Sequence, residues 1–200
     1  EPRTPLERAQ DLVYDAWDTS DRRERIRLAQ EALSISPDCA DAYVILAQET
    51  ARSAEEAEPL YAQGVAAGER AIGPELFEEA VGQFWGVLET RPYMRALEGL
   101  SQALWALDRR EEAIARAQEM LRLNPDDNQG MRYTLLGWLL PAGRDEEAGA
   151  LLEAYADDGA ATWLYGQALH AFRREGDSRR SRRLLTEALR ANPYVAGYLL

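Results

Sequence analysis

Residues 91–127 read RPYMRALEGLSQALWALDRREEAIARAQEMLRLNPDD, and this stretch decides the fold. Its first half carries apolar residues spaced i, i+3 and i+7, as on one face of a helix: Leu97, Leu100 and Leu104. Its second half carries another such face: Ala113, Ala117 and Met120. A polar break at 108–110 separates the two halves, and Pro125 ends the second helix because a proline disfavours the α conformation of the residue before it. The stretch therefore predicts two antiparallel helices that small side chains allow to pack closely.

The same spacing recurs along the chain in a frame of about 34 residues. The units that fit this frame or its proline are 6–37, 40–72, 94–127, 128–158 and 162–193. An extra helix at 74–89 and the start of a terminal helix at 194–200 lie outside it. The pattern resembles the tetratricopeptide repeat (TPR), although Leu97, Ser101 and Ala117 replace its usual Trp, Gly and aromatic residue. We therefore predict an all-α fold, an α-solenoid of TPR-like hairpins with about 11–12 helices. The resemblance further implies a right-handed superhelix that forms a single domain over 1–200.

Local signals predict where several helices begin and end. The helices predicted for the first two units are 5–18, 22–35, 39–52 and 54–72. Asp21 is a suitable N-cap for the second of these helices. Pro59 lies inside the fourth, so this helix is expected to start just before Pro59 or to bend there. Gly73-Pro74 marks a boundary, and helically spaced apolar residues predict a helix at 75–89 that completes no repeat.

The composition argues against several classes of protein. A net charge of -12 argues against a general nucleic-acid binder, because such proteins need a basic surface. Cys39 is the only cysteine, which excludes an intrachain disulfide and a Cys-based metal site. All 23 basic residues are Arg, a bias typical of GC-rich bacterial genomes; selection for bidentate Arg contacts is the alternative. No apolar run approaches the roughly 20 residues of a membrane span. We expect a cytoplasmic protein with no nucleic-acid and no membrane partner. Because Glu1 is not an initiator Met and 195–200 lacks a helix stop signal, the native chain is expected to extend further.

Four strings of residues are more specific than the repeat frame. They are PDCADAYVILAQETARSAEEAEPLYAQGVAAGE (37–69), ETRPYMRAL (89–97), MLRLNPDDNQG (120–130) and NPYVAGYLL (192–200). Together they resemble the suppression-of-tumorigenicity family of TPR proteins, in particular its soluble bacterial members, over nearly the whole chain. The resemblance implies helical repeats and no established catalytic chemistry. Eukaryotic members of that family carry membrane segments, which this sequence lacks, so their location and role are not transferred.

The sequence offers no set of residues for catalysis. His170 is the only histidine, and its place in a repeat helix favours a packed or surface residue over a nucleophilic triad. The glycines lack the spacing of a phosphate-binding loop. Pairs of Glu near helix starts complement the helix dipole. The Arg run at 179–183 is most simply a solvated face, and contact with an acidic partner is the alternative. We expect no enzyme, no cofactor and no metal.

In TPR proteins the first helices of successive units line a concave groove, and this groove is the predicted site. The candidate peptide- or anion-binding residues are Arg91, Arg95, Gln102, Trp105, Asn128, Gln129 and Arg132. Arg95 and Arg132 could hold a carboxylate or another anion, helped by a helix N-terminus at Asn128. In the alternative, the Arg side chains of this set form structural salt bridges with nearby acids: Glu89, Glu98 or Asp127. For the aromatic residues the alternative is a place in the core.

Two functions follow from this interpretation. The first is a non-enzymatic interaction scaffold that binds a peptide or protein segment in the concave groove. The second is a structural or assembly module that acts through self-association at 194–200 or through a missing C-terminal part. Homo-oligomerisation is left open.

Overall fold

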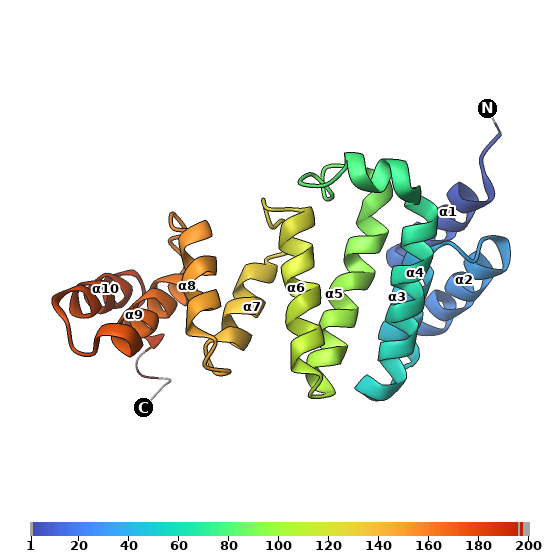
Figure 1. Ribbon diagram of the computed structural model, residues 1–200. Helices are drawn as coiled ribbons and strands as arrows, with labels where there is room; N and C mark the ends of the chain where they lie inside the picture. Colours follow the sequence, from blue (N-terminus) through green and yellow to red (C-terminus); the bar gives the residue numbers. More distant parts are fainter. Residues whose placement is uncertain (1, 196, 198–200) are drawn as a thin grey trace. The chain divides into compact units, whose positions relative to one another are not determined.

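The computed structural model describes residues 2–195 and 197, which form helices and connecting turns without a strand (Figure 1). The α-helices are α1 (Pro5–Asp18), α2 (Arg22–Ile35), α3 (Ala40–Thr50), α4 (Ala54–Glu79), α5 (Arg91–Ala106), α6 (Arg110–Leu123), α7 (Met131–Leu139), α8 (Asp145–Ala154), α9 (Ala161–Glu175) and α10 (Arg179–Ala191). A short 3-10 helix, η1 (Leu88–Thr90), precedes α5. The predicted all-α class is confirmed. The helix expected to start at 194–200 falls largely outside the described residues.

The chain divides into two compact units, Glu1–Met131 and Arg132–Leu200. In the first unit α1 packs on α2, α3 on α4, and α5 on α6. In the second unit α9 packs on α10. These four packed pairs fall at the predicted units 6–37, 40–72, 94–127 and 162–193. The division into five repeat units and the single domain over 1–200 both stay predictions.

Side chains cap the starts of both helices of the first hairpin, and one of these caps, Asp21, is the predicted one. The side chain of Thr4 accepts a hydrogen bond from the backbone N–H of Glu7, and the Glu7 carboxylate accepts one from the N–H of Thr4. Asp21 caps α2 by accepting a hydrogen bond from the N–H of Arg23. These side chains satisfy N–H groups that a helix start leaves without a partner. The predicted helices at 5–18 and 22–35 are both confirmed.

Helix α4 departs from the prediction at Pro59 and agrees with it at Gly73. The helix begins at Ala54, well before Pro59, so a start just before Pro59 is wrong. The helical backbone is interrupted at Gly73, where φ is 72° and ψ is 162°. Glycine adopts this positive φ without the steric cost of a Cβ atom. The predicted boundary at Gly73-Pro74 is therefore a kink between two helical segments.

The predicted helix at 75–89, with its extra unit at 74–89, is wrong beyond Glu79. Residues after Glu79 turn away and cover the end of α6: the N–H groups of Gly82 and Phe84 donate to the Leu123 carbonyl at 2.9 and 3.2 Å. Gly82 adopts a φ of 91°, which ends a regular helix. Phe84 is fully buried against Phe77, with ring centroids 4.9 Å apart. The apolar residues whose spacing resembled a helix are used for tertiary packing instead. The described part of the chain therefore has ten α-helices, where about 11–12 were expected.

The core of the second unit is built around Trp163, which is fully buried. The rings of Tyr133 and Tyr155 meet Trp163 edge to face at 5.9 and 6.0 Å between centroids. His170 on α9 forms a hydrogen bond with the Asp145 carbonyl at 2.8 Å, which joins α9 to the start of α8. This contact gives His170 a structural place in the second unit.

Candidate functional site

A buried ion pair links three first helices of the first unit. Asp41 on α3 is fully buried, and its carboxylate accepts hydrogen bonds from Nε and Nη2 of Arg95 on α5 at 2.7 and 2.6 Å. Gln10 on α1 donates a third hydrogen bond to Asp41 at 2.9 Å. A bidentate guanidinium–carboxylate pair is strong and fixed in geometry. Arg95 is thereby positioned between α1, α3 and α5.

The guanidinium of Arg95 also lies 5.0 Å from the ring centroid of Trp17, in cation–π geometry. The carboxylate of Asp41 meets the edge of the Arg95 guanidinium, and the ring of Trp17 lies against its face. Arg95 therefore already has the carboxylate contact that an anionic ligand would supply. The geometry thus favours the structural alternative for Arg95. Its partner, however, is Asp41 and not one of the acids near Arg95 in sequence.

A small polar pocket opens beside this ion pair, with a volume of about 220 Å³. Its lining residues come from α3, α4 and α5: Val44, Gln48, Tyr61, Arg95, Glu98, Gly99 and Gln102. Gly99 allows α4 to approach α5, because a Cβ atom there would lie 2.1 Å from Cε1 of Tyr61. Two predicted residues, Arg95 and Gln102, are brought together in this pocket.

Glu98 carries the unbalanced charge of the polar pocket. Its carboxylate accepts hydrogen bonds from the side-chain amides of Gln129 at 2.5 Å and Gln102 at 3.4 Å. Among the described residues Glu98 forms no ion pair, because Arg95 in the same pocket is engaged by Asp41. Burial raises the pKa of Glu98, and nearby Asp127 adds to this, while the Gln129 hydrogen bond opposes it. The pocket thus presents one carboxylate held by neutral donors.

The other predicted residues of the first unit do not converge on a single ligand site. Arg91 donates from Nε to the Trp85 carbonyl at 2.8 Å, and its guanidinium lies 5.6 Å from the Trp85 ring centroid. Trp105 lies under the guanidinium of Arg110 at 5.2 Å. Asn128 accepts a hydrogen bond from Asn124 at 3.1 Å. Of this group, only Gln129 contacts the polar pocket, through Glu98.

Arg132 belongs to the second unit, where it contacts the Asp158 carboxylate and the rings of Tyr133 and Tyr155. Its Nε donates to Asp158 at 2.8 Å, and Asp158 also accepts a hydrogen bond from the Tyr133 hydroxyl at 2.6 Å. The guanidinium lies 4.4 Å from the Tyr133 ring centroid and 5.2 Å from that of Tyr155. Since Arg95 and Arg132 lie in different units, their joint site stays a prediction.

Asp41, Gln48 and Tyr61 belong to the site but were not predicted from the sequence. Asp41 and Arg95 occupy the same position in the first helices of their repeat units, counted from Ala40 and Met94. Opposite charges at equivalent positions of two first helices are the signal that could have revealed this pair. No comparable signal marks Tyr61, which reaches the pocket from α4.

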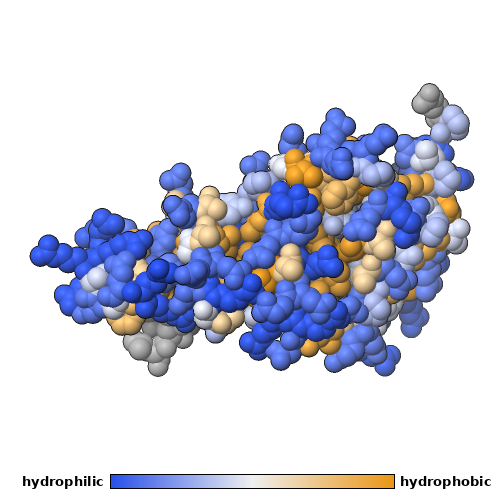
Figure 2. Space-filling view, viewed as in Figure 1, coloured by the Kyte–Doolittle hydropathy of each residue, from blue (hydrophilic) through white to orange (hydrophobic). Residues whose placement is uncertain are grey.

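Neither metal-binding nor membrane-spanning features are found in the described part of the chain. No group of three or more His, Cys, Asp or Glu side chains among residues 2–195 and 197 could hold a metal ion. Within the same residues, every helix is too short or too polar to cross a membrane. In Figure 2, hydrophilic side chains cover much of the face shown, with hydrophobic surface between them over the α4–α6 part of the first unit.

The chain is similar to one protein family by sequence. Residues 4–77 match the model of the ST7 protein family. Suppressor of tumorigenicity 7 protein-like from Bos taurus and from Homo sapiens is 41% identical over 58 residues, and that from Gallus gallus is 40% identical over the same length. These 58 residues are 29% of this chain and 10% of each relative, so the chain spans about a tenth of the length of the curated relatives it matches. The predicted resemblance is confirmed over residues 4–77, and for the strings at 89–97, 120–130 and 192–200 it stays a prediction.

The fold is similar to that of YrrB, whose crystal structure is described as that of a TPR protein with an unusual peptide-binding site. The two folds superpose with a TM-score of 0.63 over 98% of this chain and 91% of YrrB, at 17% sequence identity. The predicted α-solenoid of TPR-like hairpins is thereby confirmed as the fold.

Proposed function

We propose that this chain is a non-enzymatic interaction scaffold that binds a partner segment at the polar pocket of α3, α4 and α5. The single observation that carries the proposal is Glu98, a half-buried carboxylate that has only amide donors among the described residues. In place of the anion predicted from the Arg residues, the pocket is proposed to take a basic side chain, Lys or Arg, of the partner.

The charge balance of the pocket supports a cationic ligand. The charges of Arg95 and Asp41 cancel within their bidentate pair, which leaves the single negative charge of Glu98. A guanidinium or ammonium group would replace water at this carboxylate with a charge-assisted hydrogen bond, and such bonds are about twice as strong as neutral ones. Gln48 and the Tyr61 hydroxyl, which also line the pocket, are suited to the remaining polar contacts of a partner backbone.

The fold and the surrounding charge agree with this function. The similar fold of YrrB includes a peptide-binding site, and we extend peptide binding to this chain as part of the proposal. Residues 1–131 hold 14 Arg and 26 acidic residues, so the unit that contains the pocket is itself acidic. A negative field of this kind raises the local concentration and the association rate of basic partners.

The test is a selection of random peptides against three forms of the chain. These forms are the intact chain, Glu98→Gln, and the matched control Glu69→Gln, which removes one exposed charge from α4. Peptides that bind the intact chain and Glu69→Gln are expected to be enriched in Lys or Arg. A bound basic side chain is worth about 1.5–3 kcal/mol through its charged hydrogen bond, so Glu98→Gln is expected to weaken the best peptide at least about tenfold.

A change in the peptide separates the pocket from general electrostatics. Replacing the key Arg of the best peptide with citrulline keeps its shape and removes its charge. This peptide is expected to lose about the same affinity for the intact chain, and to lose no further affinity for Glu98→Gln. Fluorescence anisotropy measures both affinities. Selected peptides without basic residues, or equal binding to Glu98→Gln and Glu69→Gln, would show that the proposal is wrong.

The alternative function, self-association, rests on a segment that is largely outside the described residues. Tyr194 at its start is 76% exposed, and sedimentation of the intact chain beside Tyr194→Asp measures whether this segment joins two copies. The cytoplasmic location and the bacterial origin expected from the sequence stay predictions.

A further inference from the structure

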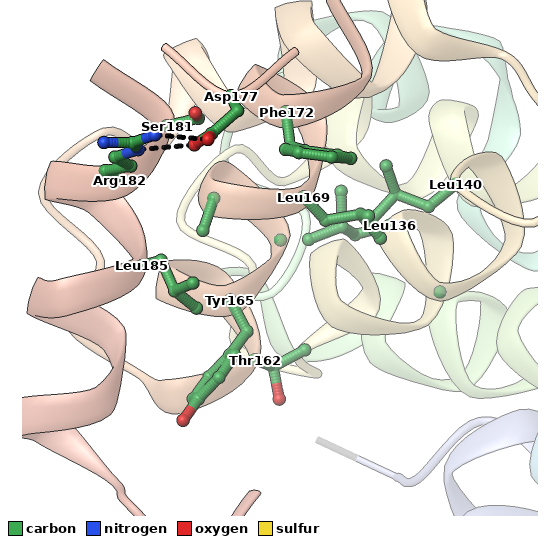
Figure 3. A pocket seen from close by; sticks show the side chains of 13 residues that line it. Leu136, Leu140, Thr162, Tyr165, Leu169, Phe172, Asp177, Ser181, Arg182 and Leu185 are labelled. Carbon is green, nitrogen blue, oxygen red and sulfur yellow. Dashed lines mark hydrogen bonds and ion pairs between the residues drawn. The ribbon is translucent and has the colours of Figure 1, made fainter. Parts of the chain in front are cut away.

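The second unit contains an apolar pocket between α7, α9 and α10, with a volume of about 580 Å³ (Figure 3). Its walls are mainly apolar side chains: Leu136, Leu140, Tyr165, Leu169, Phe172 and Leu185. Three of these are about half exposed to solvent: Leu169 at 43%, Phe172 at 55% and Leu185 at 45%. None of these residues belongs to the binding site predicted from the sequence, although their helical spacing is visible there.

The two glycines of the lining have different surroundings. Gly137 lines it, and a Cβ atom at Gly137 would meet no atom within 4 Å. Gly166 lies deeper, where a Cβ atom would come within 2.8 Å of Cδ2 of Leu136. The empty space above Gly137 is therefore room that a ligand side chain can occupy without displacing the protein.

The helices around the pocket carry an excess of positive charge. Residues 161–195, which form α9 and α10 with their flanks, hold seven Arg and three acidic residues, although the whole chain has a net charge of -12. At the rim, Arg182 pairs with Asp177 (Figure 3). Arg179 lies one helical turn before Arg182 on the same side of α10, and no ion pair of Arg179 is found among the described residues. In Figure 2 this hairpin presents mainly hydrophilic side chains.

Because the walls of the pocket are apolar, they determine which backbone conformation of a bound peptide fits. An extended peptide would bury its N–H and C=O groups against apolar side chains, and unpaired buried polar groups are costly. A helix satisfies its own backbone groups and presents apolar side chains every three to four residues. Polar groups of the lining such as Ser181 are already used inside the hairpin, since its hydroxyl donates to the Gly176 carbonyl at 2.9 Å. An amphipathic helix therefore matches the pocket, and the Arg-rich rim selects one with acidic flanks.

We propose that the apolar pocket of α7, α9 and α10 binds an amphipathic helix of an acidic partner. Its apolar side chains enter the space between Gly137 and Leu185, and its carboxylates meet Arg179 at the rim, where Arg182 is already paired with Asp177. This site lies within the second unit and does not depend on the polar pocket of the first.

The experiment uses two synthetic peptides of about five helical turns. Both carry Leu at i, i+3, i+4 and i+7; one has Glu at the flanking positions and the other has Lys. Fluorescence anisotropy measures their binding to the intact full chain and to three variants, whose helicity is checked by circular dichroism. Leu185→Asp and Gly137→Leu alter the pocket. Leu189→Asp is the matched control, because Leu189 is 37% exposed on the same helix and does not line the pocket.

The acidic peptide is expected to bind the intact chain and Leu189→Asp with affinities within about twofold of each other. Leu185→Asp and Gly137→Leu are each expected to weaken binding about tenfold or more. The basic peptide is expected to bind at least about tenfold more weakly than the acidic one, with the difference shrinking as salt is added. Equal binding of the two peptides, or equal losses in Leu185→Asp and Leu189→Asp, would overturn the proposal. So would a dimer of the intact chain that Leu185→Asp dissociates, since the occupant would then be a second copy.

Discussion

Removing Arg95 should destabilise the first unit far more than removing a similar Arg from an exposed ion pair. The change is Arg95→Met, which keeps much of the aliphatic stem and deletes both hydrogen bonds to Asp41. Asp41 is fully buried and would keep only the Gln10 amide as a side-chain donor. Breaking a buried pair by removing one partner costs about 3–5 kcal/mol. Because 26% of the Arg95 side chain is exposed, water can partly replace it, and we expect a loss of about 3 kcal/mol.

The matched control is Arg70→Met. Arg70 pairs with Asp38 at 2.7 Å, but the two side chains are 55% and 38% exposed. Exposed pairs contribute about 0–1 kcal/mol, so this variant should differ little from the intact chain. Both variants remove one Arg from the first unit. They differ in the burial of the partner acid, in the number of hydrogen bonds to it and in the contact of Arg95 with the Trp17 ring.

Native-state hydrogen exchange of the full chain, followed by mass spectrometry, is the suitable assay because it resolves local stability. A loss of about 3 kcal/mol corresponds to roughly 100-fold faster exchange, expected in peptides from α1, α3 and α5 of Arg95→Met. Peptides from α8 to α10 serve as an internal reference for the second unit. Adding Asp41→Asn to Arg95→Met should recover part of the loss, since no charge is then left buried. Equal exchange in Arg95→Met and Arg70→Met would refute the reasoning.

Three further predictions concern single positions. Gly99→Ala should lower the free energy of unfolding by about 1–3 kcal/mol, because its Cβ atom would meet the Tyr61 ring. Gly137→Ala should instead raise it by about 0.5–1 kcal/mol, because this helical position is open. Thermal unfolding of both variants tests the difference, and similar shifts would contradict it. Because the pKa of Glu98 is raised, its contribution to stability is present below pH 4.5, its ordinary pKa, and is lost as the pH rises. Glu98→Gln should therefore flatten this part of the pH profile of hydrogen exchange in α5. An unchanged profile would exclude the effect. Burial raises the pKa of Cys39 to about 12, so a thiol reagent should label it slowly in the folded chain and fully in denaturant; fast labelling of the folded chain would disprove its burial.

Local signals were sufficient where a helix end is set by residues next to it in sequence. The starts of α1 and α2 are set by Thr4, Glu7 and Asp21, whose side chains bond to backbone groups within three residues, and Asp21 was the cap predicted from the sequence. The segment after Glu79 failed because its conformation depends on the carbonyl of Leu123, more than 40 residues later. Apolar spacing alone does not distinguish a helix from a turn whose aromatic residues are buried by another helix.

Two residues of the polar pocket were predicted from the sequence, but the contacts around them were not. Placing Arg95 and Gln102 on the inner side of a first helix required only the repeat frame, and both line the polar pocket. The ligand of Arg95 was beyond local reasoning, because Asp41 lies 54 residues earlier in the sequence. Glu98 was considered as a salt-bridge partner, yet its environment of neutral amides depends on Gln129, which the fold brings to it from 31 residues away.

The two proposed pockets select partners of opposite charge, and the distribution of charge along the chain supports this division. The net charge of -12 arises within residues 1–131, because residues 132–200 hold nine Arg and nine acidic residues. Within the second unit the Arg residues concentrate in α9 and α10, next to the apolar pocket. A basic segment at Glu98 and an acidic helix at the apolar pocket would each gain from the local field. Each peptide would meet a repulsive field at the other pocket, so neither should displace the other in a competition experiment. Full mutual displacement would mean that both peptides bind a single surface.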